Sequence, residues 1–187
     1  PSERYLGLFD DTDERFDASV RTKFYDKNGN LLTSAADPEY IAPHCKKYED
    51  YDRVMDAGAS SKNIYFIRYA DLIYAECLLA ENDLAGAKQQ VIRVRNRAKV
   101  STPITASNNT EMLDFIYEER MRELGMEGWR RMDLIRRGAD YFAAQVDKYN
   151  PFAKGNVQPY HAFYPIPTNE INMNDGIGAE DQNEGYK

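Results

Sequence analysis

The sequence lacks the features that identify a membrane-spanning, nucleic-acid-binding or catalytic chain. No apolar run approaches the roughly 20 residues that a spanning helix needs. Basic residues are the minority, 24 Lys and Arg against 31 Asp and Glu, and the resulting net charge of −7 disfavours contact with a phosphate backbone. Neither a glycine-rich phosphate loop nor a G-x-S-x-G nucleophile turn occurs. We therefore expect no transmembrane helix, no nucleic-acid partner, no cofactor and no catalytic residue.

Histidine and cysteine are also scarce, at two residues each. His44 stands beside Cys45, but His161 is far along the chain, and no cluster has the spacing of a metal site. Cys77 stands beside Leu78 in a strongly helical stretch, which favours a small buried apolar side chain over a disulfide with Cys45. We expect neither a bound metal nor a disulfide.

No secretion signal is recognisable at the start of the chain, because PSERYLGLFDD contains neither a basic stretch nor an apolar stretch. If the protein is exported, we expect its signal to precede residue 1. The opening Pro, in place of an initiator Met, favours a fragment or a processed chain.

Aromatic side chains are abundant: 14 Tyr, 8 Phe and 1 Trp make up 12% of the residues. Tyr combines an apolar face with a polar hydroxyl, which suits half-hydrated surfaces that hold other molecules. The same rings can instead anchor long loops onto a helical core. Composition alone leaves both roles open.

The chain is predicted to form one domain of three segments. Residues 1–62 are rich in Pro, Gly, Asp, Asn and Ser, which is typical of loops. Residues 63–138 show helical periodicity and are predicted to form the core. Residues 139–187 are predicted to be an irregular tail packed on that core.

A short hairpin is predicted within the first segment, at residues 22–32. Asn28-Gly29 supplies the positive backbone φ angles of a tight turn. Asp26, Asn28 and Asn30 alternate as ligands do in a calcium loop, but Gly29 takes the fourth position of that pattern instead of the sixth. We therefore expect a turn and no calcium site.

Two helices are predicted at residues 64–80 and 84–98. Because so few residues separate them, they should pack as antiparallel neighbours. Ala75 and Ala87 place small side chains where two such helices approach closely, with larger apolar side chains beside them. This is the physical basis of a tetratricopeptide-like hairpin.

A third helix is predicted at residues 110–125 and a shorter fourth at 127–138. The third should begin at a cap supplied by Asn108, Asn109 or Thr110 and end near Gly125. Its predicted apolar stripe consists of Leu113, Tyr117, Met121 and Leu124.

Charged residues concentrate between Glu118 and Arg137. Glu119 and Glu123 are one helical turn apart, as an acid–base pair could be. Every carboxylate there has an Arg within three or four residues, however, and such pairs tie helices together and keep both partners ionised. We therefore predict a structural network. A second acidic run is predicted to be a solvated surface; it consists of Asp10, Asp11, Asp13 and Glu14.

Five blocks of sequence resemble, in order, the motifs of the SusD/RagB family. The first two are similar to R-x-A-E-x-x-L-x-x-A-E, with Asp71 in place of the usual Glu, and to V-R-x-R-A. The third resembles E-R-x-x-E-L…E-G-x-R-x-x-D-L-x-R-x-G. The last two resemble P-I-P-x-x-E-I and Q-N-P-G-Y, with Glu184 in place of Pro. The blocks are Arg68–Glu76, Val94–Ala98, Glu119–Gly138, Tyr164–Ile171 and Gln182–Tyr186.

Upstream, Asp13-Glu14-Arg15 and Lys47-Tyr48 are similar to the family's D-P-R and K-Y landmarks. All these motifs belong to the family's scaffold. The scaffold residues matched in the helical part of this chain are Arg68, Glu76, Glu119, Arg120, Glu123, Glu127, Trp129, Arg130 and Asp133.

The resemblance implies a mainly α fold of tetratricopeptide-like antiparallel hairpins with long irregular loops, the C-terminal part of a much longer protein. It also implies a noncatalytic glycan-binding lipoprotein of Bacteroidetes, exposed at the outer membrane and held there by a lipid upstream of this chain. Such proteins act in nutrient uptake as a lid over a SusC-like TonB-dependent transporter and deliver glycans or peptides.

Scaffold motifs identify no ligand contacts. The family's sugar-stacking rings come mostly from variable loops and from the part that would precede this chain, so we expect the main glycan site there. Within this chain, the candidate glycan-binding residues are Tyr25, Tyr40 and Tyr51, which lie in polar loops. A helical scaffold that binds a protein or peptide, with no sugar site, is the alternative.

Overall fold

The structure is a computed structural model that describes residues 1–32, 42–47 and 67–187 of the 187-residue chain. It divides into two compact units, residues 1–127 and residues 128–187. Helices predominate in both, which confirms the predicted mainly α class. Within the described ranges, no helix is long and apolar enough to cross a membrane.

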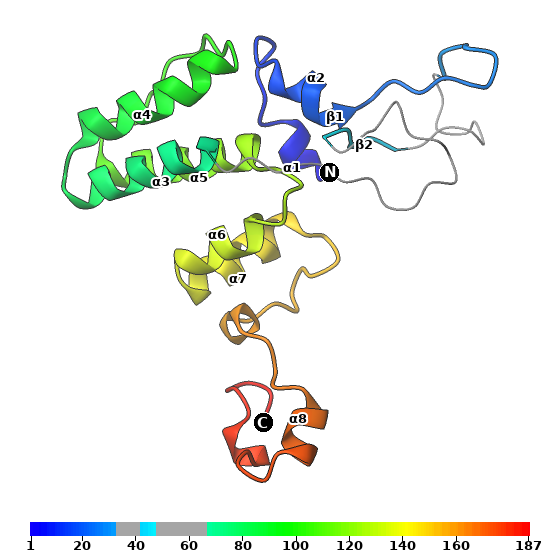
Figure 1. The fold of residues 1–187 in the computed structure, drawn as a ribbon, viewed down its shortest axis with the longest axis vertical. Coiled ribbons are helices and arrows are strands. Elements are labelled where there is room, and N and C mark those ends of the chain that lie inside the picture. Colours follow the sequence, from blue (N-terminus) through cyan, green and yellow to red (C-terminus); the bar gives the residue numbers. More distant parts are fainter. Residues whose placement is uncertain (33–41, 48–66) are drawn as a thin grey trace. The chain divides into compact units, whose positions relative to one another are not determined.

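The first unit is built on three long helices that follow a segment of short elements (Figure 1). Its elements are α1 Glu3–Leu6, α2 Arg15–Ser19, β1 Val20–Arg21, β2 His44–Cys45, α3 Ile67–Ala80, α4 Leu84–Arg97 and α5 Asn109–Glu123.

Helices α3 and α4 form the predicted hairpin and pack side by side (Figure 1). Ala75 and Ala87 are both fully buried, so the small residues do lie where the helices meet. Asp83 caps α4, since its carboxylate accepts a hydrogen bond from the Gly86 amide at 2.8 Å. The first residues of the predicted helix, 64–66, lie outside the described part. Both thiols are free. Cys45 is half-buried, but Cys77 is exposed on α3, so the prediction that Cys77 is buried was wrong.

Helix α5 packs against the α3–α4 hairpin. Asn108 caps it by accepting a hydrogen bond from the Glu111 amide at 3.0 Å, as one of the three predicted caps. The predicted apolar stripe is only partly right. Tyr117 and Leu124 are buried, but Met112 and Ile116, with no exposed surface, take the core positions, and the other two predicted members are half-buried. The buried face of α5 differs from the predicted apolar stripe because it also carries charged residues, which are described below.

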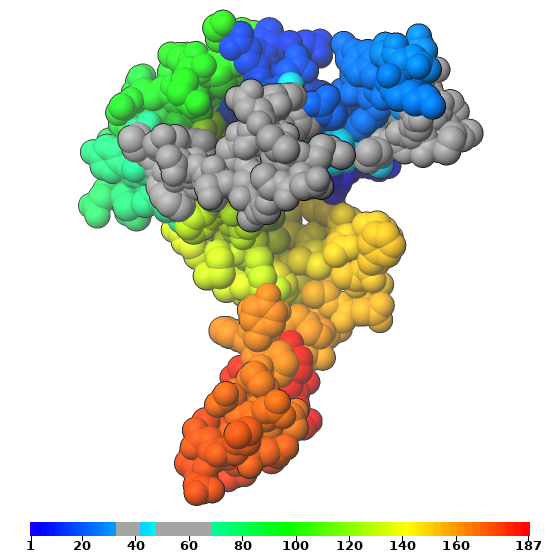
Figure 2. All heavy atoms as spheres, turned by 45° about the vertical axis from the view of Figure 1, so that its right-hand side comes forward, coloured from blue at the N-terminus to red at the C-terminus, as the bar shows by residue number. Residues whose placement is uncertain are grey.

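The segment before the long helices contains the predicted turn. An antiparallel bridge joins Tyr25 to Leu31, and Gly29 has the positive φ of +84° that the turn requires. Strand β1 pairs antiparallel with β2. Figure 2 shows residues 25–32, in lighter blue, at the surface.

The second unit contains α6 Arg130–Arg136, α7 Ala139–Tyr149, the 3₁₀ turn η1 Pro159–Ala162, α8 Thr168–Met173 and the 3₁₀ turn η2 Ala179–Asp181. Its core contains Leu134, Phe142 and Ala162. The predicted fourth helix starts later than expected because Met126 and Gly128 have positive φ angles of +65° and +86°, which no helix continues through.

Helix α7 was not predicted. Residues 139–149 were predicted to belong to an irregular tail, yet Phe142 and Ala143 are buried on an 11-residue helix. Only Arg137 and Gly138 separate α7 from α6, and Gly138 has a positive φ of +107°. From Asn150 onward the chain consists of loops, the two 3₁₀ turns and the short helix α8. The predicted packing of the tail on the helical core, and its membership of one domain, stay predictions.

Candidate functional site

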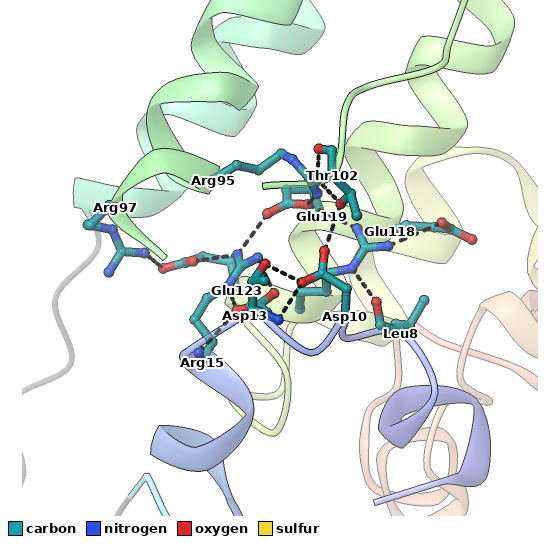
Figure 3. A network of polar contacts seen from close by, with 12 residues as sticks. Leu8, Asp10, Asp13, Arg15, Arg95, Arg97, Thr102, Glu118, Glu119 and Glu123 are labelled. Atoms are coloured by element: carbon teal, nitrogen blue, oxygen red, sulfur yellow. Dashed lines mark hydrogen bonds and ion pairs between the residues drawn. The ribbon is translucent and has the colours of Figure 1, made fainter. Parts of the chain in front are cut away.

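The charged residues of α5 form a buried network with a segment near the N-terminus (Figure 3). Arg15 Nη1 lies 2.7 Å from Glu119 Oε1 and 3.0 Å from Glu123 Oε2. Asp13 faces the same guanidinium at 2.7 Å. Glu119, Glu123 and Asp13 are all at least 94% buried, so water contributes little to their solvation and the guanidinium replaces it.

Arginines from α4 and from α5 itself complete the network. Arg95, on α4, lies 3.2 Å from Glu119 and donates to the Thr102 carbonyl oxygen at 2.6 Å. Arg122, on α5, lies 2.9 Å from Glu119 and donates to the Leu8 carbonyl oxygen at 2.8 Å. The network therefore joins residues 8–15, α4 and α5 through charge-assisted hydrogen bonds.

This arrangement confirms that Glu119 and Glu123 belong to a structural network. Burial alone would lower the pKa of Arg15, but the hydrogen bonds to Asp13 and the charge of Glu119 raise it well above its usual range. Both glutamates therefore face a permanent positive charge.

Asp13 shows that part of the second acidic run was wrongly predicted to be solvated. It is 6% exposed and pairs with Arg15. Asp10 is half-buried and accepts hydrogen bonds from Thr102 and Thr12, which lower its pKa. Arg15 and Thr12 are close in sequence to these carboxylates, whereas Thr102 lies far along the chain, so a count of local charges could not reveal its contact with Asp10.

Two further scaffold residues, Glu76 and Arg120, join α3 to α5. Their charged groups are 3.6 Å apart, and Arg120 is fully buried. Its guanidinium lies 4.5 Å from the centre of the Tyr69 ring and 5.8 Å from that of Tyr117, as in cation–π contacts. The side chain of Arg68 lies outside the described part.

Lys47 supplies a contact that sequence periodicity did not indicate. Its Nζ lies 2.9 Å from Glu127 Oε1 and donates to the carbonyl oxygen of Glu123 at 2.9 Å. It thus holds the end of α5, where backbone carbonyls need donors. The K-Y resemblance was the one signal that singled it out.

In the second unit, Trp129 stands at the start of α6 and Asp133 is buried. Arg131, which is not among the matched scaffold residues, contacts two other parts of this unit. Its guanidinium lies 4.9 Å from the Phe142 ring centre and donates to the His161 carbonyl oxygen at 2.7 Å. It therefore fixes η1 to the helices of this unit.

Of the three candidate glycan-binding tyrosines, only Tyr25 lies in the described part. Its side chain is 54% exposed beside the turn at Gly29. The neighbouring Asp26 carboxylate accepts hydrogen bonds from Asn30 and from the Asn28 amide, which lower its pKa. The carboxylate is thus engaged by its own turn, and Tyr25 offers a ring with few free polar groups beside it.

No metal centre is found in the described ranges, where no three His, Cys, Asp or Glu side chains lie close enough to share an ion.

The second unit has a pocket of about 720 Å³, which we call the C-terminal pocket. Two rings, two amides, one carboxylate and small residues surround it. The lining residues are Ala139, Gln158, Pro159, Tyr160, Phe163, Asn183, Glu184 and Gly185.

Three side chains near the C-terminus hold the wall of this pocket in place. The Gln182 side chain accepts from the Ile166 amide at 2.7 Å and donates to the Ile166 carbonyl oxygen at 2.9 Å. Asn183 Nδ2 donates to the Tyr164 carbonyl oxygen at 2.7 Å. The Tyr186 hydroxyl donates to the Phe163 carbonyl oxygen at 3.1 Å. Side-chain hydrogen bonds, instead of the backbone pairing of two strands, thus hold the Q-N-x-G-Y block to residues 163–166.

Comparison with known proteins gives consistent matches. The model of the SusD family matches residues 1–186. A SusD-like protein of Formosa agariphila is 34% identical over 134 residues, which cover 68% of this chain and 25% of that protein. The starch-binding protein SusD of Bacteroides thetaiotaomicron is 31% identical over 130 residues, covering 66% of this chain and 21% of that protein.

A solved structure, that of B. fragilis NanU, superposes with a TM-score of 0.65 at 25% identity. The match covers 100% of this chain and 39% of the NanU chain. The chain therefore spans about a quarter of the length of the curated relatives it matches and under half of this structure.

Proposed function

Because this chain belongs to the SusD family, we propose that it is part of a noncatalytic glycan-binding component of a nutrient-uptake complex. The observation that carries the proposal is the match of the family model to nearly the whole chain. The name of one relative, a starch-binding protein, supports a glycan as the ligand.

The geometry of the charged residues supports binding over catalysis. A general acid needs a proton at neutral pH and access to the substrate. Glu119 and Glu123 are buried against Arg15. Their charges stabilise the fold, and neither residue is among those that line the C-terminal pocket.

The proposal includes a partner and a location. In it, the whole protein forms a lid over a SusC-like TonB-dependent transporter at the outer membrane, held at the cell surface by a lipid anchor upstream of this chain. Family membership supports this assignment.

Isothermal titration of the natural full-length protein against a panel of oligosaccharides tests the glycan proposal. We expect saturable binding to one class of sugar. Absence of heat with every sugar, together with tight binding of a peptide, would instead support the helical scaffold that binds a protein. On α3, Tyr74 is 53% exposed and Cys77 is exposed three residues later, so a protein partner would find an apolar contact there.

A further inference from the structure

The C-terminal pocket has a size and shape suited to a small ligand. Its volume of about 720 Å³ falls within the roughly 300–1,000 Å³ of small-molecule sites. Its walls come from four places in the second unit: the start of α7, the η1 turn, Phe163 and the stretch 183–185. It is therefore formed by the fold of this unit alone.

One ring in the pocket is held in place and one offers its surface. Tyr160 lies against Gly185 so closely that a Cβ there would be 2.3 Å from the ring. Phe163 is 59% exposed, although the Tyr186 hydroxyl holds its backbone carbonyl. An ordered, exposed ring on a pocket wall is a surface on which the C–H face of a sugar ring can stack.

Two acceptors stand near this ring. Asn183 uses its amide nitrogen to hold Tyr164, which fixes the orientation of the amide, while its Oδ1 accepts no hydrogen bond from the described residues. The Glu184 side chain is exposed and has no ion pair within the described part of the chain. Both oxygens can accept hydrogen bonds from sugar hydroxyls.

Charge restricts the class of sugar. Glu184 is the one charged residue among the described residues that line the pocket, and the chain as a whole carries −7. The nearby Arg131 directs its guanidinium at the Tyr164 ring, 4.3 Å from the ring centre, and at backbone carbonyls. A carboxylated or sulfated sugar would meet repulsion without a compensating cation.

We propose that the C-terminal pocket is a subsite for an uncharged sugar ring, with Phe163 as the stacking surface and Asn183 and Glu184 as hydroxyl acceptors. The inference rests on the proposed glycan-binding function and adds a position and a charge class to it. It also places one glycan contact within the second unit of this chain, whereas the candidate Tyr25 belongs to the first unit.

The test is a nuclear magnetic resonance titration of the ¹⁵N-labelled chain. The probes are neutral oligosaccharides (malto-, xylo-, manno- and galacto-series) and an acidic one, oligogalacturonate. We expect at least one neutral series to shift the amide signals of residues 160–163 and 183–185, and oligogalacturonate to leave them unchanged. Equal shifts with oligogalacturonate would overturn the charge class.

Phe163→Ala should weaken the neutral sugar at least tenfold, whereas the control Phe152→Ala should change it less than twofold. Phe152 is 95% exposed in the same unit but does not line the pocket. Glu184→Lys should allow oligogalacturonate to bind. Equal affinities of the two Phe variants would overturn the inference.

The same titration separates this inference from the proposed function. If the full-length protein binds a glycan and the shifts lie elsewhere, or the chain shows none, the function stands and the subsite is rejected. If neither the chain nor the full-length protein binds any sugar, both proposals are rejected. An apolar peptide that shifts these amides when no sugar does would identify a protein-binding pocket instead.

Discussion

Arg15 Nη1 lies 2.7 Å from Glu119 Oε1, and the Glu119 side chain has no exposed surface. This contact brings an Arg of the N-terminal segment onto the middle of α5, beside Arg95 and Arg122. It explains in physical terms why the D-x-R and E-R-x-x-E blocks occur together: each supplies the charges that the other requires in a place where water does not reach.

Glu119→Ala should therefore be strongly destabilising. It removes the buried carboxylate that faces Arg95 and Arg122 and one of the three that face Arg15, and breaking a buried pair typically costs about 3–5 kcal/mol. Urea denaturation measures the loss. The matched control is Glu118→Ala on the same helix: its side chain is 39% exposed, so we expect a loss below about 1 kcal/mol. Similar losses in both variants would contradict the role of burial.

Arg120→Ala should destabilise the chain without affecting a ligand. Arg120 is fully buried between the Tyr69 ring and Glu76, and removing one partner of such a pair costs on the order of 3 kcal/mol or more. The thermal midpoint checks this, with Arg93→Ala as control, because Arg93 is 67% exposed and lies 3.5 Å from Asp71. An unchanged midpoint with lost glycan binding would make Arg120 a ligand residue.

Gly185→Ala should cost more than Gly155→Ala. Both glycines have positive φ, +87° and +79°, so an Ala meets a backbone cost of about 1–2 kcal/mol at either site. Only at Gly185 does the new Cβ meet a ring, that of Tyr160, and overpacking adds about 1–3 kcal/mol. Thermal unfolding of both variants measures the difference. Equal midpoints would show that Tyr160 can move aside freely.

Asp10 should make stability fall in acid. The hydrogen bond from Thr102, then that from Thr12, lowers its pKa in the folded state. Its contribution is therefore complete above the unfolded-state pKa of about 3.9 and is lost as the pH falls through the folded-state pKa. Asp10→Asn should flatten the decline of the urea midpoint below about pH 4.

The control for this titration is Asp11→Asn, which removes the same charge from an exposed neighbouring side chain. If both variants flatten the acid decline equally, the effect comes from net charge and the hydrogen bonds to Asp10 contribute nothing.

Alanine at Tyr25 and Tyr40 together is expected to leave the glycan affinity of the full-length protein unaltered. The main stacking rings of the family are expected outside this chain, and the Asp26 carboxylate beside Tyr25 is engaged by its own turn. Titration calorimetry on the double variant checks this. A loss of more than tenfold, about 1.4 kcal/mol, would place the glycan at these rings.

The family and the α3–α4 hairpin were predictable because both depend on short-range patterns. Ala75 and Ala87 showed the close approach of two helices from their spacing alone, and the structure buries both. The family resemblance is confirmed by the match over residues 1–186. The sequence blocks carried enough specific residues for that assignment without any knowledge of the fold.

The residues on the buried face of α5 and the burial of Asp13 could not be predicted from short-range apolar patterns. Apolar periodicity assigns Glu119 and Glu123 to solvent, and only a partner from a distant segment makes their burial possible. Helix α7 was missed for a different reason: it follows Gly138, which resembles the end of the helical region. The C-terminal pocket depends on hydrogen bonds to backbone atoms, which leave no apolar pattern.

The two hydrogen bonds between the Gln182 side chain and the backbone of Ile166 have a consequence for evolution and engineering. The side-chain amide of Gln182 pairs with both the backbone N–H and the carbonyl oxygen of Ile166. The pairing therefore does not depend on the number of residues between Ile166 and Gln182. The intervening stretch, which carries α8, can lengthen or shorten while the two ends stay in register. It is the natural place in this unit to insert a new loop.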